Sequence, residues 1–95
     1  MPETGKLFHL PDRTRGAQDV GLQDFLRQNR DASVRISARS VTRLDVRLLQ
    51  LMLSAARSWQ ERGLDLCLCD IPEPVARTLG QLGVAPEMLR QERAE

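Results

Sequence analysis

The chain has 95 residues, of which 41% are hydrophobic and 28% charged, and its formal net charge is +1 at pH 7. These values are typical of one folded domain and exclude a disordered chain, while the near-neutral charge disfavours nucleic acid or an acidic membrane as the partner. We therefore expect a single domain over residues 1–95, with a frayed tail over residues 91–95.

The first part of the chain predicts two strands and a helix. Residues 6–10 (KLFHL) form a short apolar strand that a proline ends. Residues 17–29 carry apolar side chains at i, i+3 and i+4, which is the spacing of an amphipathic helix. Residues 33–37 (SVRIS) alternate apolar and polar side chains and predict a second strand, and residues 38–44 form the loop after it.

The second part predicts a long helix, a strand and a final helix. The long helix covers residues 45–62, with Asp45 as its N-cap and Gly63 as the residue that ends it. Residues 64–69 (LDLCLC) predict a buried strand, and residues 73–82 predict the last helix.

The order β-α-β-α-β-α predicts an α/β fold with a small, mainly parallel or mixed sheet and right-handed crossovers. The long helix has a broad apolar face, which indicates that it packs on the sheet, with Trp59 at the sheet rim. The expected core consists of Leu7, Leu22, Phe25, Leu26, Val34, Ile36, Leu48, Met52, Leu66, Leu68, Val75, Leu79 and Leu82.

Residues suited to catalysis or to metal binding are few. The only histidine is His9, and the two cysteines, Cys67 and Cys69, lie two residues apart on one predicted strand. These three side chains would supply ligands for zinc if the first and third strands were neighbours; the alternative is that both cysteines are small buried strand residues. The sequence has no glycine-rich phosphate loop and no nucleophile elbow. We expect no enzymatic activity and no cofactor.

The start of the chain, MPETGKLFHLPDR, lacks the basic segment and apolar run of a signal peptide. No stretch approaches the ~18 apolar residues of a membrane span, and two cysteines are too few for a disulfide scaffold. These features predict a cytoplasmic protein that does not insert into a membrane.

Hydroxyl side chains cluster where the second strand leads into the long helix. Ser37, Ser40 and Thr42 precede a helix amino terminus, where free N–H groups and the positive end of the helix dipole favour a phosphate. The alternative interpretation is that these hydroxyls only cap and turn the loop.

Three segments follow one another in a particular order and spacing: SVTRLDVRLLQLMLSAARSW (residues 40–59), GLDLCLCD (residues 63–70) and VARTLGQLGVAPEML (residues 75–89). Together they resemble a STAS domain, of the sulphate transporter and anti-sigma-factor antagonist family. Residues 7–26 also resemble the start of a compact bacterial subgroup.

The resemblance implies a four- or five-stranded sheet with helices on one face. It also implies that the chain binds partner proteins, such as anti-sigma factors with kinase activity, chemotaxis-like regulators or transporter subunits. A sheet covered on one face would leave the other available for a homodimer.

The chain departs from the family pattern at the usual phosphorylation site. Asp45 matches the family aspartate, but Val46 and Arg47 stand where a serine or threonine would accept the phosphate. The protein is therefore either an unswitched binder or is switched by phosphorylation at Ser40 or Thr42.

The resemblance places a partner-binding surface at the start of the long helix. Its residues in this chain are Ser40, Thr42, Arg43, Asp45, Val46, Arg47 and Gln50. The leading interpretation is a non-enzymatic signalling module that binds an anti-sigma factor, a kinase or a chemotaxis-like regulator. The alternative is an accessory cytosolic subunit of a lipid or anion transporter.

Overall fold

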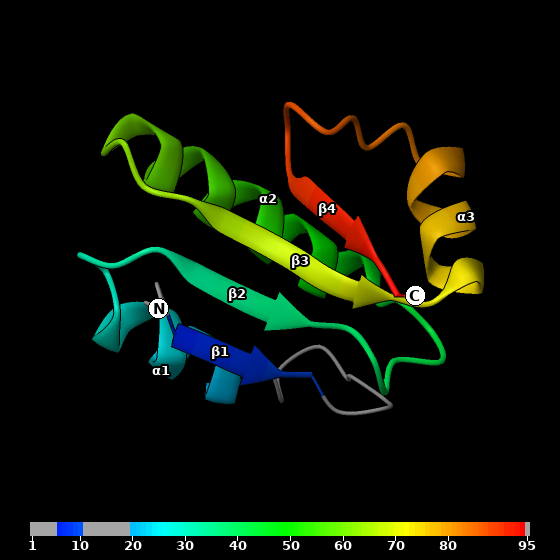
Figure 1. The fold of residues 1–95 in the computed structure, drawn as a ribbon, viewed down its shortest axis with the longest axis horizontal. Coiled ribbons are helices and arrows are strands. Elements are labelled where there is room, and N and C mark those ends of the chain that lie inside the picture. Colours follow the sequence, from blue (N-terminus) through cyan, green and yellow to red (C-terminus); the bar gives the residue numbers. More distant parts are fainter. Residues whose placement is uncertain (1–5, 11–19, 95) are drawn as a thin grey trace.

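The computed structural model describes residues 6–10 and 20–94, which fold as alternating strands and helices (Figure 1). In chain order the elements are β1 (Lys6–His9), α1 (Val20–Gln28), β2 (Val34–Ser37), α2 (Val46–Glu61), β3 (Leu66–Ile71), α3 (Glu73–Gln81) and β4 (Arg90–Arg93). The strands and helices expected from the sequence are present, with ends that differ by one to a few residues. The first residues of the predicted helix over 17–29 lie outside the described residues.

The sheet is parallel throughout, with its strands in the order β1-β2-β3-β4. Because each strand lies beside the one before it, right-handed crossovers place the connecting helices on the same face of the sheet. Figure 1 shows α1 and α2 behind the sheet, whose other face is turned toward the viewer and carries no described helix. The predicted α/β fold with a parallel sheet is confirmed.

The longest helix, α2, begins and ends where its sequence signals predict. Asp45 is the N-cap, and its Oδ1 accepts a hydrogen bond from the backbone N–H of Arg47 at 2.7 Å. Gly63 follows the helix with a φ of +74°, a conformation that glycine adopts without a Cβ clash. The residues of α2 that are buried are Leu48, Leu49, Met52, Ala55, Ala56 and Trp59.

The carboxyl-terminal segment differs from the prediction. The sequence predicts a frayed tail over residues 91–95, whereas Arg90–Arg93 form the edge strand β4, parallel to β3. The four residues of β4, RQER, include no apolar side chain, so the hydrophobic pattern carries no strand signal. Backbone pairing with β3 and a hydrogen bond from Arg35 to Glu92 (2.5 Å) hold this strand instead.

Ten of the predicted core residues are buried, and three are not. The buried ones are Leu22, Leu26, Val34, Ile36, Leu48, Met52, Leu66, Leu68, Val75 and Leu79. Leu7 is 49% exposed because its register places it beside Arg35 on the uncovered face of the sheet. Leu82 is 51% exposed because it follows the last residue of α3, and Phe25 is only partly buried.

Trp59 is buried late in α2, and its indole reaches the turn that precedes β2. Its side chain is 4% exposed, and its Nε1 donates to the backbone carbonyl of Ala32 at 2.8 Å. This bond satisfies the indole N–H and ties α2 to the turn before β2.

Candidate functional site

The carboxyl ends of the strands form one edge of the sheet, next to the amino terminus of α2. β2 ends at Ser37, and the loop over residues 38–44 leads from it to the N-cap Asp45. The loops that leave parallel strands meet at this edge, and loops held by a rigid scaffold often carry binding residues. This edge is therefore the expected position of a functional surface.

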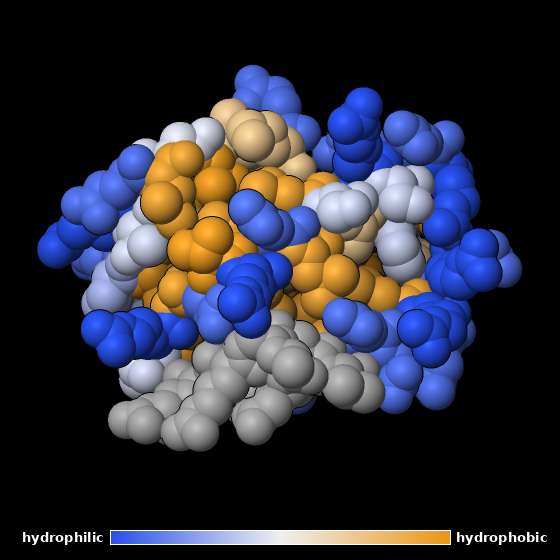
Figure 2. Space-filling model, turned by 180° about the vertical axis from the view of Figure 1, so that it is seen from behind, coloured by the Kyte–Doolittle hydropathy of each residue, from blue (hydrophilic) through white to orange (hydrophobic). Residues whose placement is uncertain are grey.

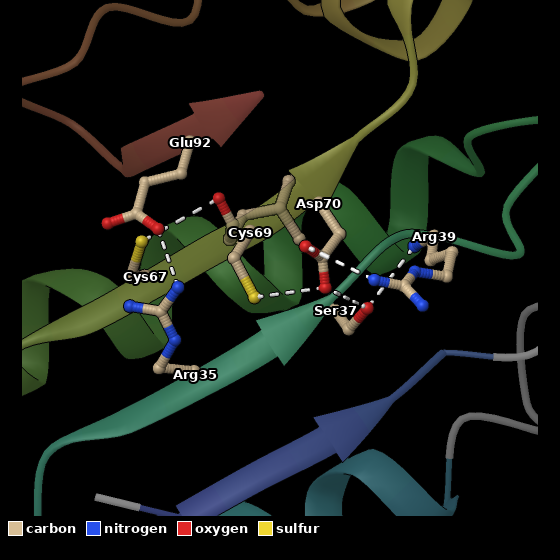
Figure 3. A network of polar contacts seen from close by, with 8 residues as sticks. Arg35, Ser37, Arg39, Cys67, Cys69, Asp70 and Glu92 are labelled. Atoms are coloured by element: carbon tan, nitrogen blue, oxygen red, sulfur yellow. Dashed lines mark hydrogen bonds and ion pairs between the residues drawn. The ribbon is translucent and has the colours of Figure 1, made fainter. Parts of the chain in front are cut away.

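Ser37 ties the end of β2 to the end of β3. Its hydroxyl donates to Oδ2 of Asp70 at 2.9 Å and accepts from the backbone N–H of Arg39 at 3.3 Å (Figure 3). The side chain is buried, so a hydroxyl without these partners would be costly. Ser37 therefore fixes the start of the loop and is not accessible as a phosphate acceptor.

Asp70 has an unusual backbone conformation for a residue other than glycine. Its φ is +53°, at a break in the register of β3 and β4 between Leu68 and Ile71. Aspartate tolerates this left-handed region better than most residues, and such irregularities re-aim side chains at sheet ends. The carboxylate of Asp70 accepts from Ser37, and its Oδ1 lies 3.9 Å from Nη2 of the exposed Arg39.

The residues predicted to bind a partner lie together in the loop and the first turns of α2. Those exposed to solvent are Ser40, Thr42, Arg43, Val46, Arg47 and Gln50. Asp45 is only partly buried, and its carboxylate caps the helix. Val46 is 54% exposed and does not lie under the loop. We call these seven residues the α2 N-terminal surface.

Positive charge gathers along this surface. Arg39, Arg43 and Arg47 follow one another at intervals of four residues, and all three are exposed. The acidic groups nearby have structural partners, because Asp45 caps α2 and Asp70 binds Ser37. The surface therefore combines one exposed aliphatic side chain with several guanidinium groups. The sequence alone did not predict the hydrogen bond between Ser37 and Asp70, which fixes the start of the loop next to this surface.

The uncovered face of the sheet carries an ion pair above the two cysteines. Arg35 on β2 and Glu92 on β4 meet at 2.5 Å, and Figure 3 shows them on either side of Cys67 of the intervening strand. The hydrogen bond between them raises the pKa of Arg35 and lowers the pKa of Glu92. A second, longer pair joins Arg90 to Asp65 at 3.5 Å. The uncovered face is therefore polar at these two ion pairs. Homodimerisation across this face stays a prediction.

Both thiols lie beneath this polar layer. Cys67 is 3% exposed and Cys69 is 2% exposed. Burial raises the pKa of Cys67 to about 11 and also raises the pKa of Cys69. Because the thiolate is the reactive form, neither cysteine is suited to nucleophilic or redox chemistry.

His9 does not join the cysteines. It is paired in register with Ser37, which is paired in turn with Cys69, so β2 separates β1 from β3. Two strand spacings place the backbones of His9 and Cys69 roughly 9–10 Å apart. The zinc alternative is therefore wrong, and within residues 6–10 and 20–94 no group of three or more His, Cys, Asp or Glu side chains could hold a metal ion. The interpretation of both cysteines as buried strand residues is confirmed.

None of the helices in the described part of the chain is long and apolar enough to cross a membrane. Comparisons of the chain with protein-family models, with curated proteins and with solved structures found no match.

Proposed function

We propose that the chain is a non-enzymatic, STAS-like binding module of bacterial signal transduction, acting in the cytoplasm. Its partner would be an anti-sigma factor, a kinase or a chemotaxis-like regulator, docked on the α2 N-terminal surface. The observation that carries this proposal is the exposure of Val46, 54%, in the first turn of α2 beside the exposed Arg47. Arginine is enriched at protein interfaces, and a partner that docks here would cover the exposed apolar side chain of Val46.

The rigidity of the surface supports the same proposal. The Asp45 cap fixes the first turn of α2, and the bonds of Ser37 to Asp70 and to the Arg39 N–H fix the start of the loop. A preorganised surface loses less conformational entropy when a partner binds. The parallel sheet with helices on one face is also compatible with the fold that the STAS resemblance implies.

Regulation by phosphorylation is a separate part of the proposal. Val46 and Arg47 cannot accept a phosphate, whereas Ser40 and Thr42 are exposed in the loop before α2. A phosphate on either hydroxyl would add negative charge next to Arg39 or Arg43 in the sequence, so it would alter the charge that a partner meets. Mass spectrometry of the protein isolated from its own cells, with a phosphate found at Ser40 or Thr42, would support a switched binder over an unswitched one.

The proposal is tested by affinity capture of the tagged protein from its own cells, with identification of what is retained. We expect a kinase, anti-sigma factor or receptor-type regulator that is lost with Arg47→Glu. The matched control is Arg57→Glu, which makes the same charge change at an exposed position later on α2. A partner retained equally by both variants would contradict the proposed surface. A transporter ATPase lost with Arg47→Glu would favour the accessory-subunit alternative.

A further inference from the structure

A groove runs between α1 and α2 on the side of the molecule opposite the uncovered sheet face. It is a shallow depression, widely open to solvent, with a volume of about 280 Å³. Its apolar lining includes the buried side chains of Leu26, Ala55 and Trp59 and the half-buried Leu51. Figure 2, which views this helical face, shows apolar surface lying between hydrophilic side chains.

The charged side chains that line the groove are all arginines: Arg27, Arg30 and Arg62. Two acidic residues lie near them, but Asp24 is 3.7 Å from Arg27 and Asp31 is 4.0 Å from Arg62, and both acids are exposed. Such long, solvated pairs are weak, and the three arginines outnumber the two acids, so the cluster keeps a net positive charge. Arg30 makes no ion pair within the described part of the chain. The groove therefore has a small apolar floor, a positive rim and three uncharged polar side chains, those of Gln23, Ser54 and Ser58.

Arg62 is held in place before any ligand arrives. Its Nη1 donates to the carbonyl of Arg30, its Nη2 donates to Oγ of Ser58 at 3.3 Å, and its guanidinium lies 5.1 Å from the ring centre of Trp59. A guanidinium that is already ordered loses little side-chain entropy on binding a carboxylate. Arginine is also among the residues most enriched at positions that dominate binding energy at protein interfaces.

We propose that this groove docks an acidic amphipathic helix of another protein. Two helices form its walls, so a third helix can lay an apolar ridge between them, as helix-in-groove interfaces do. Acidic residues beside that ridge would meet Arg27, Arg30 and Arg62. The site is distinct from the α2 N-terminal surface, because Arg47 and Arg62 are fifteen residues apart, about 22 Å along the helix axis. One molecule could therefore hold two partners at once.

The test uses a pair of amphipathic peptides of about 20 residues, each with leucine at i, i+3, i+4 and i+7 spacing. One carries glutamate beside the leucines and the other carries lysine, and neither contains an aromatic residue. Binding is followed by anisotropy of the labelled peptides, and by the emission of Trp59 with unlabelled peptide, since the chain has one tryptophan and no tyrosine. We expect the glutamate peptide to bind about tenfold or more tightly than the lysine peptide.

The double variant Arg27→Glu/Arg30→Glu should abolish or reverse this preference. The matched control, Arg77→Glu/Arg93→Glu, makes the same change of charge on α3 and β4 and should preserve it. Circular dichroism checks that both variants stay folded. Failure of the glutamate peptide to bind at up to about 1 mM, or equal binding of both peptides, would overturn the proposal. The proposal would also be overturned if the protein bound phosphatidylglycerol vesicles and not the peptide. An equal loss of the preference for the glutamate peptide in the control variant would overturn it too. None of these results depends on the partner of the α2 N-terminal surface.

Discussion

Among single residues, Cys67 makes the free energy of unfolding depend on pH in the alkaline range. Burial raises the pKa of its thiol from 9.0 to about 11, because the thiolate is poorly solvated in the sheet. A group with a raised pKa in the folded state stabilises the fold fully below its unfolded pKa, and this stabilisation is lost as pH rises through the folded pKa. We expect the free energy of unfolding to fall by roughly 2–3 kcal/mol between about pH 9 and pH 11.

Urea unfolding of the wild type and of Cys67→Val over this pH range measures that effect. Valine keeps a small β-forming side chain and removes the ionisable group, so the variant should lose less stability as pH rises. The chain has no tyrosine, which keeps other titrations in this range few. The raised pKa of Cys69 gives the variant a residual slope of the same sign. Identical slopes for the two proteins would contradict the assignment to Cys67.

Asp70 combines a side-chain role with a backbone role. Asp70→Ala removes the acceptor of the buried Ser37 hydroxyl, and alanine lacks the short polar side chain that lets aspartate tolerate a φ of +53°. We expect a loss of about 1–3 kcal/mol of unfolding free energy. Asp70→Asn keeps an acceptor and tolerates the same φ, so it should stay within about 1 kcal/mol of the wild type. Chemical unfolding of both variants decides this, and an equal effect of alanine and asparagine would refute the account.

The exposed residues of the α2 N-terminal surface could be predicted from the sequence, because loop and first-turn positions with polar neighbours are generally solvated. The hydrogen bond between Ser37 and Asp70, which supports this surface, could not be predicted from the sequence. Ser37 and Asp70 are 33 residues apart, and only the pairing of β2 with β3 and the left-handed backbone of Asp70 bring them together. Neither the strand register nor that φ has a signature in this sequence.

At the scale of elements, predictability follows the strength of local signals. α2 has an N-cap, a broad apolar face and a terminal glycine, and each of these signals is satisfied. β4 has none, since RQER forms a strand only because β3 offers it an unpaired edge. The groove between α1 and α2 could not be predicted from the sequence either, because no local signal marks it. Its walls are 20 or more residues apart in sequence, and their packing depends on the tertiary fold.

The difference between Leu66 and Leu82 tests the placement of β3 and the end of α3. Leu66 is 3% exposed in β3, so Leu66→Ala should cost about 2–5 kcal/mol of unfolding free energy. Leu82 is 51% exposed, so Leu82→Ala should change it by no more than about 0.5 kcal/mol. Thermal melts of the two variants compare them directly. Equal melting temperatures would show that one of the two leucines is misplaced.

At the scale of the whole molecule, the order of the strands determines where a partner can bind. A parallel sheet with strands in sequence order has its helices on one face and its β-to-α loops at one edge. The α2 N-terminal surface lies at that edge, and the α1–α2 groove reaches the other end of α2 at Arg62. The two proposed sites therefore share one rigid helix, which would hold two partners at a fixed separation.

Docking of a partner on Val46 and its neighbours can be tested with two aliphatic residues of similar exposure. Val46 is 54% exposed and Leu82 is 51% exposed, and each is replaced by aspartate. An acidic residue in the first turn of α2 suits the helix dipole, so Val46→Asp should not weaken the fold. The measurement is the amount of partner captured from native cells by the wild type and by each variant, quantified by mass spectrometry. We expect Val46→Asp to lower recovery about tenfold or more and Leu82→Asp to leave it unchanged; equal recovery with both variants would show that the partner does not dock on Val46.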